Sequence, residues 1–295
     1  MEPQLLRTFV AVVRHGSFSA AAMQLGYTQA AVSQQIAVLE SDLKTKLLTR
    51  RPVIPTEAGA RLLEHAEPIL IRLDAARADV TRMTTAPAAT LLIGVTPLAA
   101  MTPALSTALA ALRQQMPRLD VSVQTATRPR IAVGVARGEL DLGLTDGLTA
   151  PGDPLPELAP VTAVGLSEQG VMIVLPAGHP LAARRALHLA DLADARWIAA
   201  DDVAPPLAEV RWHAGTEGFR AAFRYAGQDT ATLVRLASGG HGLTLLPETA
   251  ARQPHITAVP VRTPRLCHRT ELLHAALAGG SPAASLAAML ARSEG

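Results

Sequence analysis

Apolar residues recur at intervals of three and four along the start of the chain, which is the spacing of one face of a helix. The stretch 17–40 predicts two such helices. The first has Ser19 as its N-cap and ends at Gly26, a residue type that readily takes the left-handed conformation of a helix terminus. The second begins after Thr28, and its inward face is apolar: Val32, Ile36 and Leu39. Two short helices joined by so tight a turn form a helix-turn-helix.

The outward face of the second helix carries only small and amide side chains, at Gln29, Ala30, Ser33 and Gln34. Such a face fits the major groove of DNA, because Gln bonds the adenine edge through two atoms, Ser bonds a base or a phosphate, and an Ala methyl contacts the thymine methyl. The same residue types are common on solvated helix faces. The close helix crossing and the sharp turn favour DNA. Together with Thr28, these are the predicted DNA-reading residues.

A long amphipathic helix is predicted from Thr56 to about Thr85. Its apolar stripe comprises Leu62, Leu63, Ile69, Leu70, Leu73 and Val80. A stripe of this length, on a helix between two domains, is buried either against a second copy of the helix or against its own domain. Pro68 predicts a bend or a break. The segment 84–89 predicts a hinge.

From Leu91 onward, short apolar runs alternate with helical patterns, which is typical of an α/β domain with a mostly parallel sheet. The first set predicts strands at 91–95, 120–125 and 140–144, with helices at 103–116 and 131–138. A proline-rich stretch, 151–160, interrupts the pattern. The second set predicts strands at 171–175, 197–198, 221–225 and 243–246, and a helix at 229–239. The segment 272–292 predicts a strand and a helix that return to the first set.

The distribution of charge along the chain indicates where DNA contacts would lie. Of 295 residues, 49% are apolar and 18% charged, which is ample for sizeable buried cores. Residues 1–90 hold ten Lys or Arg against eight Asp or Glu, and the remainder holds 17 of each, so the net charge of +2 lies with the helix-turn-helix. The basic residues after the second helix are Lys44, Lys46, Arg50 and Arg51. We predict phosphate contacts for Arg50 and Arg51.

Several kinds of chemistry find no support in the sequence. Cys267 is the single cysteine, which excludes an intramolecular disulfide and fits a reducing cytoplasm. The nine His are dispersed without metal-ligand spacing, and no phosphate loop or Gly-x-Ser-x-Gly elbow occurs. The chain starts without a signal peptide, and no apolar run reaches the length of a membrane span. We therefore expect a cytoplasmic protein that is not an enzyme and has no metal, cofactor or membrane.

The N-terminal residues resemble the DNA-binding domain of LysR-type transcriptional regulators. The matching positions are Leu6, Phe9 and Val12, then Gly16-Ser17-Phe18, Ala21-Ala22, Leu25, Gln29, Ala31-Val32-Ser33, Ile36, Leu39-Glu40 and Thr56-Glu57-Ala58-Gly59. Lys44 and Leu48 depart from the family pattern, which has Gly and Phe there. The wing, at 50–56, is about two residues shorter than in the pattern. Looser landmarks at 138–144, 179–182, 191–192 and 240–247 extend the resemblance over the chain.

The resemblance implies an α/β protein with an N-terminal all-α part. Its winged helix-turn-helix DNA-binding domain would span residues 1–59, and a linker and dimerisation helix with its hinge would span 60–87. Residues 88–295 would form a two-lobed effector-binding domain similar to periplasmic solute-binding proteins. Lobe I would comprise about 88–160 and 268–295, and lobe II about 161–267.

Small molecules bind such domains in the cleft, at loops that follow strands and at helix N-termini. On lobe I this predicts Thr96, Pro97, Leu98, Thr127 and Arg128 as effector-binding residues. Thr96 is alternatively a helix N-cap, and Arg128 is either a carboxylate ligand or a surface ion-pair partner. On lobe II the stretch after 197–198 leads to Asp201 and Asp202, of which we predict Asp201 as a ligand. Acidic residues favour a cationic or hydroxylated effector or simply cap a turn, so the two lobes disagree about effector charge.

The sequence thus predicts a transcriptional regulator that binds promoter DNA as a homodimer or homotetramer and responds to a small-molecule effector of unknown identity. Two alternatives remain open. One is a cytoplasmic solute-binding protein, because the larger part of the chain resembles that fold. The other is a regulator whose C-terminal domain only assembles the oligomer.

Overall fold

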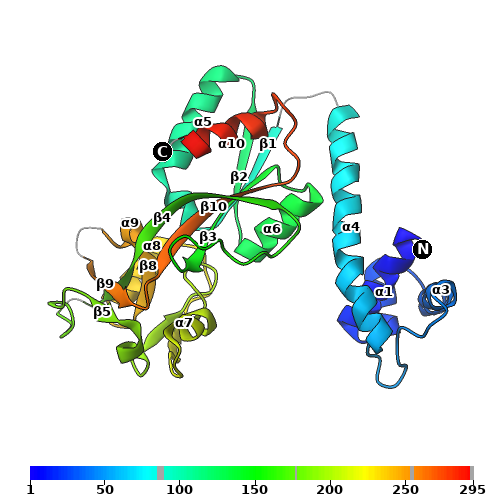
Figure 1. Cartoon of the computed structure of the whole chain (residues 1–295), viewed down its shortest axis with the longest axis horizontal. Coiled ribbons are helices and arrows are strands. Elements are labelled where there is room, and N and C mark those ends of the chain that lie inside the picture. Colours follow the sequence, from blue (N-terminus) through cyan, green and yellow to red (C-terminus); the bar gives the residue numbers. More distant parts are fainter. Residues whose placement is uncertain (85–89, 177, 253–255, 293–295) are drawn as a thin grey trace. The chain divides into compact units, whose positions relative to one another are not determined.

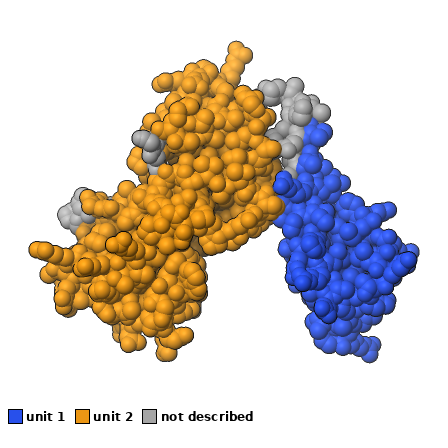
Figure 2. Space-filling model, in the orientation of Figure 1, with its two compact units in different colours: residues 1–84 blue, residues 85–295 orange. Residues whose placement is uncertain are grey.

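The computed structural model describes residues 1–84, 90–176, 178–252 and 256–292 of the chain (Figure 1). Contacts divide the chain into two compact units, Met1–Thr84 and Thr85–Gly295, which Figure 2 colours separately. The predicted hinge falls at this boundary and, apart from Thr84, lies outside the described residues. None of the described helices is long and apolar enough to cross a membrane.

Four helices form the N-terminal unit, and their inward faces build one apolar core. They are α1 (Pro3–His15), α2 (Phe18–Leu25), α3 (Gln29–Asp42) and α4 (Glu57–Thr84). The fully buried members of the core include Phe9, Val12, Ala21, Val32, Ile36 and Leu39. The predicted helix-turn-helix is therefore present, with the apolar faces of both its helices turned inward.

The caps of these helices follow the sequence with one exception. Gly26 ends α2 in the left-handed conformation at φ 70°, and the Thr28 hydroxyl accepts from the Ala31 N–H at 3.2 Å. The N-cap of α2 is Ser17, whose hydroxyl accepts from the Ala20 N–H at 3.3 Å, so the prediction of Ser19 was wrong. The left-handed Gly16 ends α1 immediately before Ser17, so α2 starts two residues earlier than its apolar pattern indicates.

A short wing follows α3. Leu48 and Pro55 form an antiparallel bridge, and the Thr49 N–H donates to the Ile54 carbonyl at 2.9 Å. Between α3 and the wing, Lys44 takes φ +52°, a left-handed conformation that favours glycine. This is the position at which the family pattern has Gly.

Helix α4 packs its first half on its own unit. Ala66 and Leu70 are buried against α1, and Leu62 and Leu63 are half-buried beside them. Arg7 pairs with Asp74, and Arg14 pairs with Glu67 at 2.8 Å, which fixes α1 along α4 as far as Asp74. The helix continues through Pro68 without a break. The apolar side chains of Ile69 and Val80 are 44% and 61% exposed.

The sheet of the C-terminal unit is mixed, so the prediction of a mostly parallel sheet was wrong. In parallel pairs, β1 (Thr90–Val95) lies between β2 (Asp120–Thr125) and β3 (Leu142–Thr149). In antiparallel pairs, β10 (Cys267–His274) lies between β3 and β4 (Thr162–Leu175), and β4 continues beside β8 (Thr244–Pro247) and β9 (Thr257–Thr263). The short β5 (Leu187–His188) pairs with β9 in parallel, and β6 (Trp197–Ala199) and β7 (Ala221–Arg224) form a separate parallel sheet of two strands.

Helices cover this sheet in two groups that we call lobe I and lobe II. In lobe I, α5 (Pro103–Gln115) packs on α10 (Pro282–Arg292), and α6 (Arg128–Arg137) packs on β1, β3 and β10 (Figure 1). The lobe I core includes Leu91, Ile93, Leu112, Leu142, Leu144 and Leu286. Lobe II holds α7 (Leu207–Ala214), α8 (Thr230–Ser238) and α9 (Glu248–Ala251). Its buried Trp197 lies 5.3 Å from the Phe219 ring, centroid to centroid.

Glu40 is a buried carboxylate that joins α3 to the wing. One carboxylate oxygen accepts from the N–H groups of Leu47 at 2.9 Å and Leu48 at 3.4 Å, and the other lies 2.7 Å from Lys46 Nζ. Burial alone would raise the pKa of Glu40, but the hydrogen bonds from Lys46, Leu47 and Leu48 outweigh it and lower the pKa. The charged form of Glu40 therefore stabilises the connection on which the wing depends.

We expect Glu40→Gln to destabilise the N-terminal unit at neutral pH by about 1.5–3 kcal/mol, because hydrogen bonds to a charged group are lost. Faster amide hydrogen exchange in residues 29–56 measures this. The folded pKa is the lower one, so the stabilisation is complete above the unfolded pKa and is lost as pH falls through the folded pKa. The difference between variant and wild type should therefore shrink on acidification. The control Glu57→Gln, an exposed residue, should change exchange little, and equal effects would contradict the prediction.

Candidate nucleic-acid interface and effector cleft

The outward side of α3 presents most of the predicted DNA-reading residues to solvent. Gln29, Ala30 and Gln34 are exposed, and Ser33 is half-buried. Thr28 is also exposed, but its hydroxyl is engaged as the cap of α3. The side chains of these residues are short or amide-bearing, and no carboxylate interrupts the first turns of the helix.

The inward side fixes the orientation of α3. Val32, Ile36 and Leu39 are buried in the core of the unit. The Thr8 hydroxyl of α1 donates to the Gln35 side-chain oxygen at 2.5 Å, which ties α3 to α1 by a polar contact at the edge of that core. Rotation of α3 would expose these apolar residues, so its outward face is held in place.

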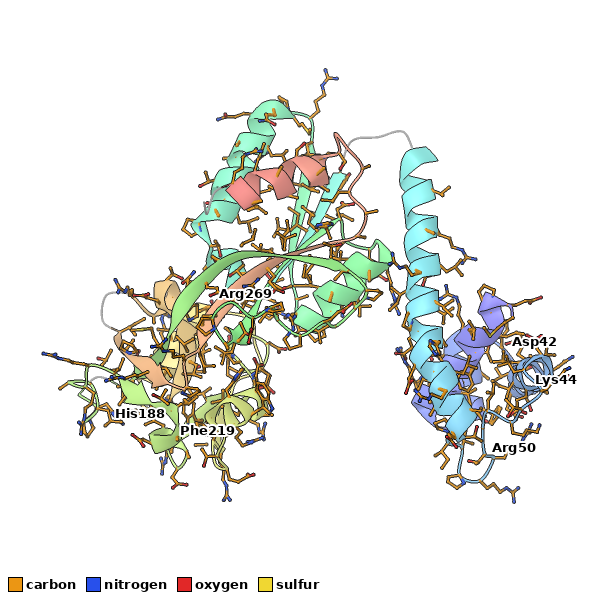
Figure 3. The ribbon with its side chains drawn as sticks, viewed as in Figure 1. Asp42, Lys44, Arg50, His188, Phe219 and Arg269 are labelled. Atoms are coloured by element: carbon orange, nitrogen blue, oxygen red, sulfur yellow. The ribbon has the colours of Figure 1, made fainter. Side chains whose placement is uncertain are left out.

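The basic residues after α3 differ in their availability. Arg50, which Figure 3 labels, and Arg51 lie exposed in the wing. The Arg50 guanidinium carbon lies 5.7 Å from the centroid of the Phe18 ring. Lys44 is exposed before the wing, whereas Lys46 pairs with Glu40 at 2.7 Å. Of the predicted basic patch, Lys44, Arg50 and Arg51 make no ion pair within the described residues.

A cleft of about 390 Å³ opens between lobe I and lobe II. Its lining includes five of the predicted effector-binding residues: Thr96, Pro97, Thr127, Arg128 and Asp201. The sixth, Leu98, lies apart from this lining, because its side chain is 4% exposed and packs in the lobe II core with Val174 and Ile198. The prediction for Leu98 was wrong because an apolar side chain next to Pro97 turns inward where burial is available.

Thr96 is held by a carboxylate that the sequence analysis did not single out. Its hydroxyl donates to Asp146 Oδ1, which also accepts from the Ala99 N–H at 3.2 Å. On the other side, Asp146 Oδ2 lies 2.8 Å from Nε2 of the buried His268. Burial would raise the pKa of Asp146, but His268 and the hydrogen bonds from Thr96 and Ala99 lower it. Asp146 therefore stays charged and fixes the wall of the cleft.

Arg128 begins α6 and lines the cleft as a partly unsatisfied cation. One terminal N–H group donates to the Pro156 carbonyl, while the buried Nε makes no hydrogen bond within the described part of the chain. Burial lowers the pKa of Arg128, and the negative charges of Glu271, Glu209 and Asp146 act against this shift. The guanidinium remains charged at neutral pH and is not a surface ion pair.

The wall contributed by lobe II is acidic. Glu209 of α7 lines the cleft with Asp201 and Asp202. Burial raises the pKa of Glu209, although a hydrogen bond from the Leu148 backbone and the charge of Arg128 oppose the shift. Asp201 and Asp202 form no ion pair among the described residues. On the lobe I wall, Asp146 is engaged by Thr96, Ala99 and His268, which leaves the cation of Arg128 opposite the carboxylates of lobe II.

A second set of charges lies behind the cleft. Arg269 Nε is 2.8 Å from Glu271 Oε1, and its Nη1 is 2.7 Å from Glu168 Oε1. Glu271 also accepts from the Leu155 N–H at 3.0 Å, and Glu168 accepts from the Gly152 N–H at the same distance. These bonds hold the segment 152–155, whose Leu155 lines the cleft.

Sequence reasoning missed Asp146, Glu209, His268 and Glu271. Asp146 had a usable signal, because it follows a buried apolar run and lies just beyond Leu144, which pairs with Val95 at the carboxyl end of the parallel strand β1. Glu209 and His268 had none, since each reaches the cleft region only through packing of distant segments. Among the described residues, no group of His, Cys, Asp and Glu could hold a metal ion.

Two family models match the chain. The one described as "Bacterial regulatory helix-turn-helix protein, lysR family" matches residues 3–60, and the one described as "LysR substrate binding domain" matches residues 84–294.

Known proteins resemble the chain over most of its length. A "probable hydrogen peroxide-inducible genes activator" of Mycobacterium avium is 34% identical over 250 residues, which are 83% of this chain and 77% of the relative. A protein of Streptomyces viridosporus with the same description is 31% identical over 253 residues, which are 84% and 78% of the two chains. The crystal structure of full-length BenM matches with a TM-score of 0.55 at 24% identity, covering 98% of this chain and 95% of that one, which shows a shared fold.

Proposed function

The chain belongs to the LysR family of bacterial helix-turn-helix transcriptional regulators, and on that premise we propose that α3 and the wing bind operator DNA. The observation that carries the proposal is the exposed polar face of α3 on a packed helix-turn-helix. Gln29, Ala30, Ser33 and Gln34 read base edges, and Thr28 fixes the start of the helix. Arg50 and Arg51 contact phosphates. Because the proposed target is promoter DNA, we also propose that the protein acts in the cytoplasm.

We further propose that the cleft between the lobes binds a small-molecule effector, with Thr96, Pro97, Thr127 and Arg128 on lobe I and Asp201 on lobe II. The support is a concave site at the carboxyl ends of β1 and β2, where α/β folds bind ligands. Thr96 acts through Asp146 as well as directly, because its hydroxyl already donates to that carboxylate. Effector binding changes DNA affinity to the extent that it favours one conformation of the oligomer.

For base readout we expect Gln29→Ala to weaken binding to a specific operator by about 1–3 kcal/mol while changing the affinity for random DNA little. Arg51→Ala should weaken binding to both DNAs alike and flatten the dependence of affinity on salt, because a phosphate contact is lost. A footprint on the upstream region of the gene supplies the operator, and fluorescence anisotropy at several salt concentrations supplies the affinities.

The matched controls for this experiment are Gln228→Ala and Arg118→Ala, which remove an exposed amide and an exposed guanidinium from the C-terminal unit. Both should leave DNA affinity unchanged. Equal losses on specific and random DNA for Gln29→Ala would refute base readout by α3. An unchanged salt slope for Arg51→Ala would remove the wing from the interface.

We also propose that the exposed apolar face of α4 joins two copies of the chain. The inward face of its first half is covered by α1, so the proposal rests on the exposed apolar side chains of Ile69 and Val80. Two operator-bound helix-turn-helix motifs contact about twice the bases of one, so dimerisation supports specific binding. Leu62 is unsuitable as a probe because it belongs to the core of its own unit.

We expect the double variant Ile69→Glu and Val80→Glu to give a smaller mass in analytical ultracentrifugation, because a charge at each position opposes burial against a second helix. The operator affinity should fall with the mass. The control Met23→Glu places a charge at a side chain that is 85% exposed on α2 and should leave the mass unchanged. Full retention of the wild-type mass would show that the C-terminal units alone assemble the protein.

The names of the relatives point to hydrogen peroxide, and we infer that the thiol of this chain is not a peroxide sensor. Cys267 is its single cysteine, so no second thiol of the same chain can form a disulfide with it. Burial raises the pKa of Cys267 to about 11, and the neighbouring negative charge of Glu168 acts in the same direction. Roughly one part in ten thousand is then the reactive thiolate at neutral pH.

We expect that peroxide treatment does not change the operator affinity by acting on Cys267. The measurement is anisotropy before and after peroxide for the wild type and Cys267→Ala, which should behave identically. Comparison with Cys267→Ala separates thiol chemistry from oxidation of exposed methionines such as Met23. A peroxide response that is present in the wild type and absent in Cys267→Ala would contradict the inference.

A further inference from the structure

Some of the charged side chains around the cleft form ion pairs with one another, and the others do not. Asp146 pairs with His268, and Arg269 pairs with both Glu168 and Glu271. Asp146 also accepts from Thr96 and the Ala99 N–H, and Glu168 and Glu271 accept from the backbone N–H groups of residues 152 and 155, so these three carboxylates are already engaged. The remainder consists of Arg128 on lobe I, and of Glu209, Asp201 and Asp202 on lobe II.

On the lobe I wall, Arg128 offers hydrogen-bond donors to an anionic group. Among the described residues its guanidinium makes one hydrogen bond, from a terminal N–H group to the Pro156 carbonyl, and a guanidinium has five N–H groups in a planar fork. The same wall holds the N-terminus of α6, where the Thr127 side chain makes no capping hydrogen bond and Pro129 lacks an N–H. The backbone N–H groups of the first turn of α6 therefore add to the positive potential at Arg128.

On the lobe II wall, three carboxylates line the cleft, and none of them forms an ion pair with Lys or Arg among the described residues. His213 Nε2 lies 3.9 Å from Glu209 Oε1, but burial lowers the pKa of His213, so its imidazole is neutral at neutral pH. Asp201 and Asp202 lie in the turn that follows β6 and make no ion pair within the described residues. Glu209 is half-buried, and its charge is costly to desolvate unless a cation arrives with the ligand.

Accepting the cleft as the effector site, which is the function proposed above, we propose that its effector is a small amino-acid-like zwitterion. Its carboxylate binds Arg128 and the N-terminus of α6. Its ammonium group lies against Glu209, Asp201 and Asp202. Apolar atoms between the walls, including those of Leu155, Leu158 and Val203, contact the body of the molecule.

The opposed walls also explain why ligands of one charge fit less well. A simple carboxylic acid that fills the cleft removes water from Glu209 without supplying a cation, and a simple amine does the same to Arg128. In either case one buried charge loses its solvation without a partner. The volume of about 390 Å³ accommodates a molecule of amino-acid size and lies in the range of small-molecule sites. Because lobe I favours an anionic group and lobe II favours a cationic group, a ligand that contacts both lobes needs both charges.

The test is isothermal titration of the full chain with each of the standard L-amino acids at millimolar concentration. For the amino acid that binds best, we then titrate the amine that lacks its carboxylate and the acid that lacks its amino group. We expect at least one amino acid to bind, and both analogues to bind at least tenfold more weakly. In the variants, Glu209→Gln and Asp201→Asn should weaken the amino acid about tenfold while leaving the acid analogue unaffected or improved. Arg128→Gln should weaken the amino acid and spare the amine.

Matched controls remove the same charges outside the cleft. Arg130→Gln lies two residues beyond Arg128 on α6, and Glu217→Gln lies in the loop after α7; both are exposed and should leave binding unchanged. The change in tryptophan fluorescence on unfolding, which exposes the buried Trp197 while Trp212 is already exposed, checks that each variant is folded. Asp201→Asn probes an exposed turn where folding is not at stake.

Three outcomes overturn the proposal, and they bear differently on the proposed function. If no amino acid binds, or if the acid or amine analogue binds as tightly as the amino acid, the zwitterion is wrong while the cleft remains an effector site for another class of ligand. If an amino acid binds and none of the cleft variants changes its affinity, the ligand lies elsewhere. In that case both the zwitterion in the cleft and the cleft as effector site are wrong.

Discussion

The contact on which the C-terminal unit most depends is the guanidinium of Arg269, set between two carboxylates on neighbouring strands (Figure 3). It lies over Gly165 of β4, where an added Cβ would come within 2.2 Å of its Nη2, so a larger residue there would require the Arg269 side chain to shift. The pairing of β4 and β10 shifts register at this level, between Thr270 and Glu271. One cation therefore holds the irregular part of the ladder and, through Glu271, the segment beneath the cleft. Removing it would leave Glu271 as a buried, uncompensated charge.

The N-terminal unit also depends on one charged side chain held by several partners, but there the charge is negative. There the buried group is the carboxylate of Glu40, and its partners are two backbone N–H groups and the exposed Lys46. The left-handed Lys44 lies in the same connection. A lysine in this conformation costs about a kilocalorie per mole more than glycine would, and it adds a positive charge next to the wing. Local backbone strain and local charge are thus both concentrated where α3 meets the wing.

How much the sequence predicts depends on the range of the interactions involved. The helix-turn-helix is encoded by neighbours, such as Thr28 and Gly26, and the prediction needed only one correction, at Ser19. The C-terminal sheet was predicted less well because the first half of β4 carries half-exposed side chains without an apolar run, and because β3 extends to Thr149. Leu98 was misplaced, since its burial depends on lobe II residues distant in the chain. The sequence could not predict which charges remain unpaired at the cleft, because the pairs Asp146–His268 and Arg269–Glu168 each join two strands that are distant in the chain.

The uninterrupted course of β4 has a mechanical consequence. Its first half pairs with β10 beside the core of lobe I, and its second half pairs with β8 and β9 in lobe II. A continuous strand is not a flexible hinge, because a large bend in β4 would break its hydrogen bonds to β10, β8 and β9. The softest deformation left to it is torsion about its own axis, since strands tolerate a range of twist. Motion of one lobe against the other would then appear as a small rotation that changes how the outer surfaces of both lobes are presented, instead of a wide opening of the cleft.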